Sequence, residues 1–546
     1  MTPDFTAPGP SYDRELRFIV TAEGEPTGLL RTAQAVLGGQ AVAAPLFAGA
    51  TAHNSVGGLE RFHLIRLPGV SCKELSKNPY DIAQRLRAEG GYSCVTPDLP
   101  RRPALGSQSF IDVCAINGVE GFGKWAPEAM QLTQAWDRIA AAGAGLGRGV
   151  SIGHLDTGIR PHIALDVNRI DRERSYNVLT GTGDTTDPLH TGFLLNPGHG
   201  SETAAVALGN NLSPLTGVAP EATLVDVRCT DSVVLFFNTD IAQAIWHATQ
   251  VGCEVITMSL GGTPELCTEI ALMNAAASNV IVVTAAGNCV PFVTYPASSV
   301  YSLAIAASNI TALPWTNSLG GPGSSFGAKV DISAPGQDLE VPAVTDPVNP
   351  TTQFHAGRGT SFAVAAVAGI AALWVAYRRT AAAGSVPRNL FQQLLRQSAT
   401  APGGWDTDLF GTGIVNINNL ITASGHIGAG HAGTAAAVLG PNPENWLAAV
   451  LDCTRAQAAE VIQVLFQRSS SELGIDEVPL ITELVRQLTD RPVIARQIAN
   501  SVDRRSFTAD RIAECLRPAF LDFGIATGFS DFFRERTALV PRFGRV

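Results

Sequence analysis

Charged residues are scarce in this chain, and the positive ones are outnumbered. Asp, Glu, Lys and Arg make up 16% of the 546 residues, and 38 Lys and Arg stand against 48 Asp and Glu, a formal net charge of −10. Without an excess of positive charge the chain lacks the electrostatic footprint of a nucleic-acid-binding protein, and an anionic membrane surface would repel it. We therefore expect neither nucleic acid nor a membrane as a partner.

We expect neither a secretory leader nor a membrane-spanning segment in this sequence. Its first residues include Asp4, Asp13 and Glu15 and contain no basic segment followed by an apolar stretch, so we expect no secretory signal and a cytoplasmic location. The most apolar stretch, 362–377, is shorter than the roughly 20 residues that span a bilayer. Its many alanines favour a buried core helix.

Paired cysteines of the CxxC type do not occur, although the chain has nine cysteines. Their odd number and wide spacing favour neither a zinc site nor a thiol redox motif. We expect mostly buried free thiols, with Cys289 as a small packed residue. No metal site is predicted.

Composition and apolar periodicity divide the chain into five parts. These are an N-terminal α+β segment (1–100), a linker (101–124), a large α/β domain (125–422), a second linker (423–443) and an all-α bundle (444–546). In the first part, strand patterns flank a helix pattern between residues 59 and 99, and 17–39 add an earlier strand and helix. The second linker is rich in Gly and Ala.

The last hundred residues repeat the apolar spacing of amphipathic helices. Thr454 and Gln457 form a capping-box pattern, and Ile481, Leu484, Val485 and Leu488 repeat the spacing of one helix face. We expect four to six helices without a catalytic signature. Simple packing is the first interpretation, and an adaptor that binds a partner protein is the second.

Four polar residues stand where a parallel α/β fold places its sites. Asp156 follows a buried strand, Asn288 follows another, and His199 and Ser361 each precede a run of small residues that predicts a closely packed helix. Each has a simpler explanation when taken alone: a turn aspartate, a loop histidine, a turn or cap asparagine and a helix N-cap serine. Together they are the groups that acyl transfer needs, namely a nucleophile, a base, an orienting carboxylate and an oxyanion donor.

Five short motifs give this part of the chain a family resemblance. D-T-G (156–158), H-G (199–200), S-L-G-G (259–262), A-A-G-N (285–288) and G-T-S-F-A (359–363) occur in the order found in the subtilisin-like serine proteases, the subtilase family. The resemblance covers about residues 125–422. It implies a three-layer αβα fold with a mostly parallel central sheet.

The resemblance also assigns roles to individual residues. It implies a triad of Asp156, His199 and Ser361, with the Asn288 side chain and the Ser361 backbone N–H as oxyanion donors. The residues implied to line the substrate cleft are Ser259, Leu260, Gly261, Gly262, Ala285, Ala286 and Gly287. The expected function is hydrolysis of internal peptide bonds of proteins or peptides. His154, His162 and His190 match nothing in the family pattern.

Some family features are altered or cannot be placed. Glu202 stands where a second histidine is common, which leaves the subfamily open. The N-terminal segment resembles a propeptide that assists folding and blocks the cleft, so a zymogen cut within 101–124 is expected; a permanent N-terminal domain is the alternative. No cofactor is predicted, and family calcium sites cannot be located.

Other classes fit the motifs less well. An aspartic protease needs two D-T-G aspartates and this chain has one, while an α/β-hydrolase needs G-x-S-x-G and the order Ser, acid, His. The alternative from another class is a catalytically silent subtilase fold that binds peptides or acts as a scaffold.

Overall fold

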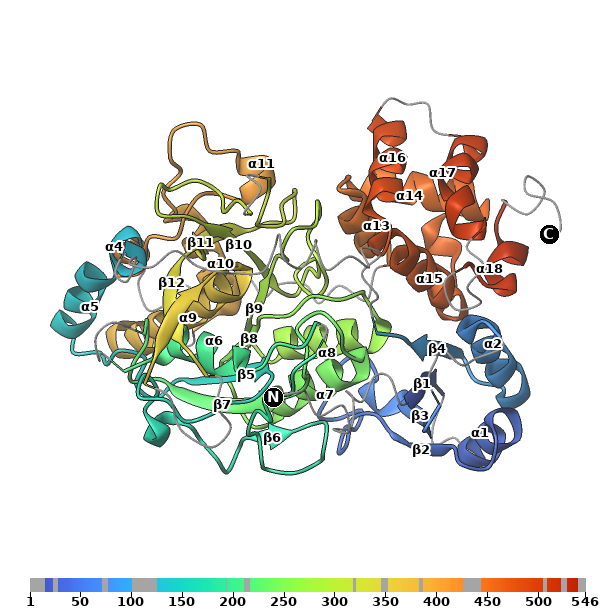
Figure 1. Ribbon diagram of the computed structural model, residues 1–546, viewed down its shortest axis with the longest axis horizontal. Helices are drawn as coiled ribbons and strands as arrows, with labels where there is room; N and C mark the ends of the chain where they lie inside the picture. Colours follow the sequence, from blue (N-terminus) through green and yellow to red (C-terminus); the bar gives the residue numbers. More distant parts are fainter. Residues whose placement is uncertain are drawn as a thin grey trace, which may run out of the picture.

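The computed structural model describes three parts of the chain (Figure 1). The described residues are 15–22, 28–70, 77–100, 125–192, 194–210, 217–317, 321–344, 352–382, 386–425, 443–503, 508–521 and 528–538. The predicted linker 101–124 and nearly all of the linker 423–443 lie outside them.

A parallel sheet forms the centre of the large domain. Its strands are β5 (Ser151–Asp156), β6 (Tyr176–Asn177), β7 (Thr223–Arg228), β8 (Val255–Met258), β9 (Ile281–Ala285), β10 (Leu303–Ser308) and β11 (Ile332–Pro335). Their order is β11-β10-β9-β8-β5-β7-β6, and every neighbouring pair is parallel. The strands are apolar because helices cover both faces of the sheet.

The helices form the two outer layers of this domain. They are α4 (Trp125–Ala129), α5 (Leu132–Ala141), α6 (His199–Leu208), α7 (Asn238–Gln250), α8 (Leu266–Ala277), α9 (Thr360–Ala382), α10 (Arg388–Gln397), α11 (Thr407–Phe410) and α12 (Ile417–Gly425), with the short 3-10 turn η3 (Val167–Arg169). One core joins the sheet to α7 and α8, and a second joins it to α5, α6, α9, α10 and α12. The predicted αβα fold is thereby confirmed.

Helix α9 is longer than the sequence pattern suggested. It runs over 23 residues from Thr360, so its length and composition alone are sufficient to cross a bilayer. The expectation that this stretch is too short was therefore wrong, because the polar ends 360–361 and 378–382 continue the helix. Its most apolar 18-residue window is entirely buried, and α9 is a core helix of the domain, as expected.

A two-stranded hairpin packs against α6 and leads directly into α9. It consists of β12 (Leu339–Pro342) and β13 (Phe354–Gly357), which pair in antiparallel fashion. β12 packs on α6, and β13 runs directly into the turn before α9. The hairpin therefore links the elements that carry His199 and Ser361.

The N-terminal part is a small α+β unit. Its elements are β1 (Glu15–Thr21), α1 (Leu29–Leu37), β2 (Val42–Pro45), η2 (Leu59–Arg61), β3 (Phe62–Pro68), α2 (Pro79–Gly90) and β4 (Cys94–Asp98). The strand order β2-β3-β1-β4 is antiparallel throughout and, with the element order β-α-β-β-α-β, gives a split-βαβ topology. Its own core lies between the sheet and the two helices.

The C-terminal part is helical. It contains α13 (Pro443–Leu451), α14 (Arg455–Phe466), α15 (Val478–Thr489), α16 (Pro492–Asp503), α17 (Ala509–Leu521) and α18 (Asp531–Arg536), with the 3-10 turns η4 (Ser470–Glu472) and η5 (Ile475–Glu477). The capping box of Thr454 and Gln457 is present at the start of α14. The buried residues of this bundle belong to the same apolar core as α7 and α8.

Candidate active site

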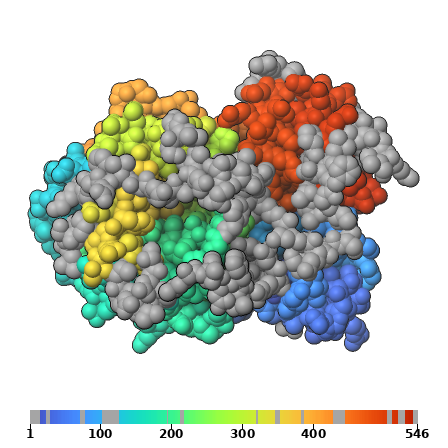
Figure 2. Space-filling view, in the orientation of Figure 1, coloured from blue at the N-terminus to red at the C-terminus, as the bar shows by residue number. Residues whose placement is uncertain are grey.

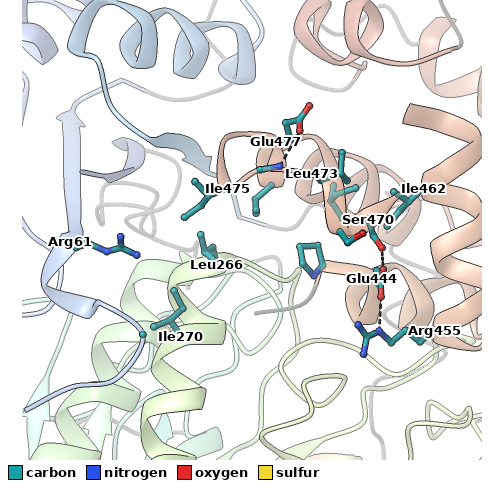
Figure 3. Close-up of a pocket in the computed structure, with 16 residues that line it drawn as sticks. Arg61, Leu266, Ile270, Glu444, Arg455, Ile462, Ser470, Leu473, Ile475 and Glu477 are labelled. Atoms are coloured by element: carbon teal, nitrogen blue, oxygen red, sulfur yellow. Dashed lines mark hydrogen bonds and ion pairs between the residues drawn. The ribbon is translucent and has the colours of Figure 1, made fainter. Parts of the chain in front are cut away.

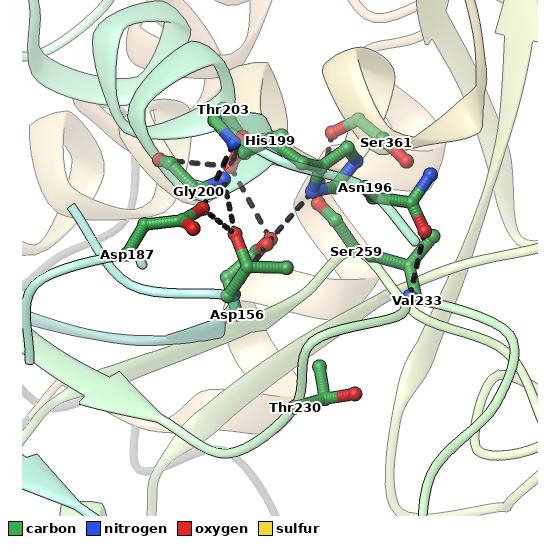
Figure 4. A network of polar contacts seen from close by, with 12 residues as sticks. Asp156, Asp187, Asn196, His199, Gly200, Thr203, Thr230, Val233, Ser259 and Ser361 are labelled. Atoms are coloured by element: carbon green, nitrogen blue, oxygen red, sulfur yellow. Dashed lines mark hydrogen bonds and ion pairs between the residues drawn. The ribbon is translucent and has the colours of Figure 1, made fainter. Parts of the chain in front are cut away.

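Asp156 and His199 form the centre of a buried polar network at the carboxyl edge of the sheet (Figure 4). Asp156 ends β5, and His199 begins α6. His199 Nδ1 lies 2.7 Å from Asp156 Oδ1, and that oxygen also accepts the N–H of Thr157 at 2.8 Å. The carboxylate therefore fixes the orientation of the imidazole ring and leaves its Nε2 available.

Two further residues, Thr203 and His154, lie beside the carboxylate of Asp156. Thr203, one turn after His199 on α6, donates its hydroxyl toward Asp156 Oδ2 at 3.3 Å and lies 2.9 Å from His154 Nε2. The imidazole of His154 is buried, with Asp226 on its other side at 3.5 Å. The sequence analysis found no role for His154. The usable signal was its position two residues before Asp156, which places both side chains on the same face of β5.

Asp187 links the two segments that carry Asp156 and His199. Its carboxylate accepts the hydroxyl of Thr157 at 2.8 Å and the N–H groups of Gly198 at 2.8 Å and Leu189 at 2.7 Å. Burial raises its pKa, although these hydrogen bonds act against the shift. Sequence reasoning missed this residue because it lies in a loop without a motif.

The charges of the pair stabilise one another. Burial alone would raise the pKa of Asp156, but the charge and hydrogen bond of His199 and the charge of His154 lower it overall. Burial likewise would lower the pKa of His199, yet Asp156, Glu202 and Asp187 together raise it. The protonated imidazole of His199 is therefore favoured at this position.

Ser361 lies in the first turn of α9, close to this pair. Its backbone oxygen accepts the hydroxyl of Ser259 at 3.0 Å, and the ring of its neighbour Phe362 lies 6.4 Å from the His199 ring, between centroids. Gly359 has φ +143, a conformation open to glycine alone. Figure 4 shows Asp156, His199, Ser259 and Ser361 gathered in one region.

The side chain of Asn288 is oriented by the residue before Ser361. Its Oδ1 accepts the N–H of Thr360 at 3.0 Å and the Thr360 hydroxyl at 2.8 Å. Because Oδ1 faces two donors, the NH₂ group must be the free end of the amide. Asn288 is an exposed residue, so this NH₂ group is available to a ligand.

The segment 259–262 is less open than the substrate prediction requires. The N–H of Gly261 donates to Val233 O at 2.9 Å, and the N–H of Gly262 donates to Tyr295 O at 2.7 Å. Ser259 and Leu260 are buried. A peptide that pairs with these N–H groups as an added strand must first displace Val233 or Tyr295.

The remaining predicted cleft residues form the base of the Asn288 turn. Ala285 ends β9 and Ala286 is fully buried. Gly287 has φ +114, and its N–H donates to the Thr360 hydroxyl at 3.3 Å. This part of the turn therefore shapes the Asn288 loop and places it against Thr360.

Cys289, the next residue, departs from the sequence prediction. It is disulfide-bonded, so its interpretation as a small packed thiol was wrong; a single sequence does not reveal which cysteines pair. Among the described residues, Cys94, Cys229, Cys253, Cys267 and Cys515 are free thiols, and all five are buried. Burial raises the pKa of Cys94 to about 12 and that of Cys253 to about 12, so these thiols are unreactive at neutral pH.

The two other histidines that matched nothing in the family pattern also have structural partners. His162 lies 3.0 Å from Gln353 O, and His190 lies 3.6 Å from Asp231. Within the described part of the chain, no group of three or more His, Cys, Asp or Glu side chains is arranged to hold a metal ion.

Comparison with known proteins agrees with this geometry. The Subtilase family (Peptidase_S8) matches residues 147–417. Subtilisin Savinase of Lederbergia lenta is 31% identical over 281 residues, covering 51% of this chain and 93% of the relative. Thermitase of Thermoactinomyces vulgaris is 32% identical over 267 residues, covering 47% and 84%. M-protease of Shouchella clausii (strain KSM-K16) is 31% identical over 281 residues, and the chain spans 66% of its length.

The fold and the motif order define a subtilisin-like serine peptidase domain. The chain belongs to the subtilase family of serine endopeptidases.

Proposed function

We propose that this chain hydrolyses internal peptide bonds of proteins through Asp156, His199 and Ser361. The observation that carries the proposal is the 2.7 Å contact between His199 Nδ1 and Asp156 Oδ1, because it fixes the imidazole tautomer that a serine nucleophile needs. His199 takes the Ser361 hydroxyl proton as the oxygen attacks the carbonyl. It then gives that proton to the leaving amine, and water repeats the cycle on the acyl-enzyme.

The oxyanion is stabilised by the side chain of Asn288 and the backbone N–H of Ser361. The orientation of Asn288 by Thr360 supports this role, since the NH₂ group is held without a competing acceptor. A preorganised donor of this kind stabilises the charge that develops on the carbonyl oxygen in the transition state. The substrate lies beside 259–262 after displacement of the contact from Val233.

Labelling with a fluorophosphonate tests the mechanism directly. We expect a covalent adduct on Ser361 in the wild type, and none in Ser361→Ala or His199→Ala, with intact mass as the readout. Loss of turnover should accompany loss of labelling. A wild type that is folded and takes no label would instead favour a silent peptide-binding or scaffold protein.

The N-terminal segment is proposed to be a propeptide. Its split-βαβ fold, packed on α7, supports the idea. A wild-type preparation that contains a new N-terminus within 101–124, absent from Ser361→Ala, would establish self-processing; an intact chain with a labelled Ser361 would establish a permanent domain.

Location and partners stay predictions. A cytoplasmic location was expected, but the disulfide of Cys289 favours an oxidising compartment, because such bonds rarely persist in the cytosol. Fractionation of cells that produce the protein distinguishes a cytoplasmic location from an oxidising compartment. Binding of a separate partner protein by the bundle is tested by affinity capture with residues 443–546 deleted as the control.

A further inference from the structure

The C-terminal bundle contacts both other parts of the chain. The bundle and the N-terminal segment lie at the same end of the molecule, red beside blue in Figures 1 and 2. A cavity of about 400 Å³ marks the junction of the three parts, and Figure 3 shows Arg61, Ile270, Glu444 and Ile475 around it. The N-terminal segment is therefore enclosed from two sides.

One side of the segment is fixed to the large domain at the start of α7. The carboxylate of Asp98, at the end of β4, accepts the N–H groups of Asn238 at 2.9 Å and Thr239 at 3.1 Å. Arg17 of β1 donates to Asp240 at 2.6 Å. All these side chains are buried, and unpaired groups here would be costly.

The other side of the segment is fixed to the bundle through the start of α2. The amide Nδ2 of Asn78 donates to Gly528 O at 3.0 Å. The carboxylate of Asp81 accepts the N–H of Phe532 at 3.1 Å and that of Asp531 at 3.4 Å, where α18 begins. Residues 450 positions apart in the sequence therefore form direct hydrogen bonds with each other.

Further contacts extend this interface along α2 and β4. Arg87 lies 2.9 Å from Asp476, and the guanidinium of Arg486 lies over the ring of Tyr80, 5.9 Å from its centroid. Tyr80 is 1% exposed. β4 also packs against η5 and α15. The interface thus combines buried aromatic packing with directed hydrogen bonds.

We propose that the bundle is a clasp, which holds the N-terminal segment on the large domain and retains it after the chain is cut within 101–124. None of these contacts depends on an intact backbone between the parts. A cut fragment has to break the contacts to α7 and those to the bundle before it can leave. The bundle therefore lengthens the time for which the fragment stays bound, beyond what the contacts to α7 alone would give.

The test measures fragment release in the full chain, with Ser361→Ala present so that self-digestion plays no part. A recognition sequence for a site-specific protease is placed within 101–124, the chain is cut, and the dissociation rate of the N-terminal fragment is measured on a surface that holds the remainder. We expect the fragment to stay bound and to co-elute in size-exclusion chromatography.

Two substitutions on the N-terminal segment, at the cap of α2 and within α2, weaken its contacts with the bundle and leave its contacts with α7 in place. Asn78→Asp keeps the α2 cap, in which Oδ1 accepts the N–H of Tyr80, but replaces the donor to Gly528 by a carboxylate. Arg87→Gln removes the ion pair with Asp476. Losing a paired group at an interface acts mainly on dissociation, so we expect release about tenfold faster for Asn78→Asp and roughly threefold faster for Arg87→Gln.

Arg85→Gln is the matched control. Arg85 lies on the same helix and pairs with Glu89 of that helix at 2.7 Å, with both side chains exposed, so its release rate should equal that of the parent. Circular dichroism of the uncut variants verifies folding. Equal rates for Arg87→Gln and Arg85→Gln, or immediate loss of the parent fragment on cutting, would overturn the clasp. The clasp rests on the proposed cut within 101–124, but the measurement needs no peptidase activity, so its failure can be told apart from a failure of the proposed function.

Discussion

The carboxylate of Glu202 lies 2.9 Å from Nε2 of His355. Glu202 follows His199 by three positions on α6, and His355 lies on β13, which leads to Ser361. The pair thus joins the helix that carries His199 to the strand that leads to Ser361. Glu202 stands at the position where the family commonly has a second histidine. The Glu202–His355 pair therefore takes the place of that residue.

Glu202 also acts on His199 through its charge, which gives the first prediction. Burial lowers the pKa of His199, while Asp156, Glu202 and Asp187 raise it above 6.5. The base has to be neutral, so kcat/KM should fall as pH drops through that raised pKa. Glu202→Gln removes one negative charge and should move this acid limb to lower pH.

The pH profile of kcat/KM on a peptide substrate checks this expectation. His355 is the other titrating partner, and Glu202 raises its pKa; His355→Gln keeps a donor but no charge, and should move the limb in the direction opposite to that of Glu202→Gln or not at all. Arg379→Gln, which breaks an exposed pair with Glu254, is the control. If the acid limb of kcat/KM lies at the same pH in all of these variants, Glu202 does not act on the pKa of His199.

The second prediction concerns Asn288. Removing an oxyanion donor costs about 10²–10³ in kcat, and Asn288→Ala should lose that much while KM changes little. Thr360→Val removes one of the two donors that orient the amide and should cause a smaller loss. Steady-state kinetics with active-site titration give kcat and KM for both variants. An Asn288→Ala enzyme at full rate would remove Asn288 from the mechanism.

The placement of the motif residues was predictable from sequence because each lies at the end of a strand or the start of a helix. Asp156 and Asn288 come together since the carboxyl ends of the parallel strands β5 and β9 share one edge of the sheet, whereas Ser361 follows the antiparallel hairpin β12–β13 at the start of α9. The supporting residues were not predictable. Asp187 reaches the site through a loop, and His154 acts through Thr203, a contact between β5 and α6 that depends on packing.

The helices of the C-terminal part were predictable from their apolar spacing, but their position was not. Periodicity shows which face of a helix is apolar, and it does not show what covers that face. The apolar core runs from α8 into the bundle, and α2 binds α18 over a long sequence separation. Neither interpretation of the bundle, simple packing or an adaptor, specified these two contacts.

The third prediction concerns the stability of the site. Asp187→Ala leaves the buried donors of Thr157 and Gly198 and the half-buried N–H of Leu189 without this acceptor, at about 1–3 kcal/mol for each buried group left unpaired. We expect a lower free energy of unfolding in urea and a slower fluorophosphonate reaction. Asp184→Ala, at an exposed position of the same loop, is the control. Equal stability and labelling in the two variants would mean that Asp187 does not hold the loops.

The fourth prediction follows from the disulfide of Cys289, which comes directly after Asn288. Cys289 has φ +56, and the bond restrains the loop that presents the amide. Reduction should therefore lower both the free energy of unfolding, by about 2–4 kcal/mol, and kcat. Cys289→Ser should reproduce both effects.

Alkylation under denaturing conditions tests whether the bond forms. A disulfide withholds a pair of the nine cysteines from the reagent until a reductant is added, and intact mass reports that difference. Cys515→Ser, at a free thiol in the distant helix α17, is the control for serine substitution. If the thiol count is the same with and without reductant, Cys289 is a free thiol and the loop is held by the contacts to Thr360 alone. If the bond is present but its reduction leaves kcat unchanged, those contacts suffice to orient Asn288, and the disulfide acts on stability only.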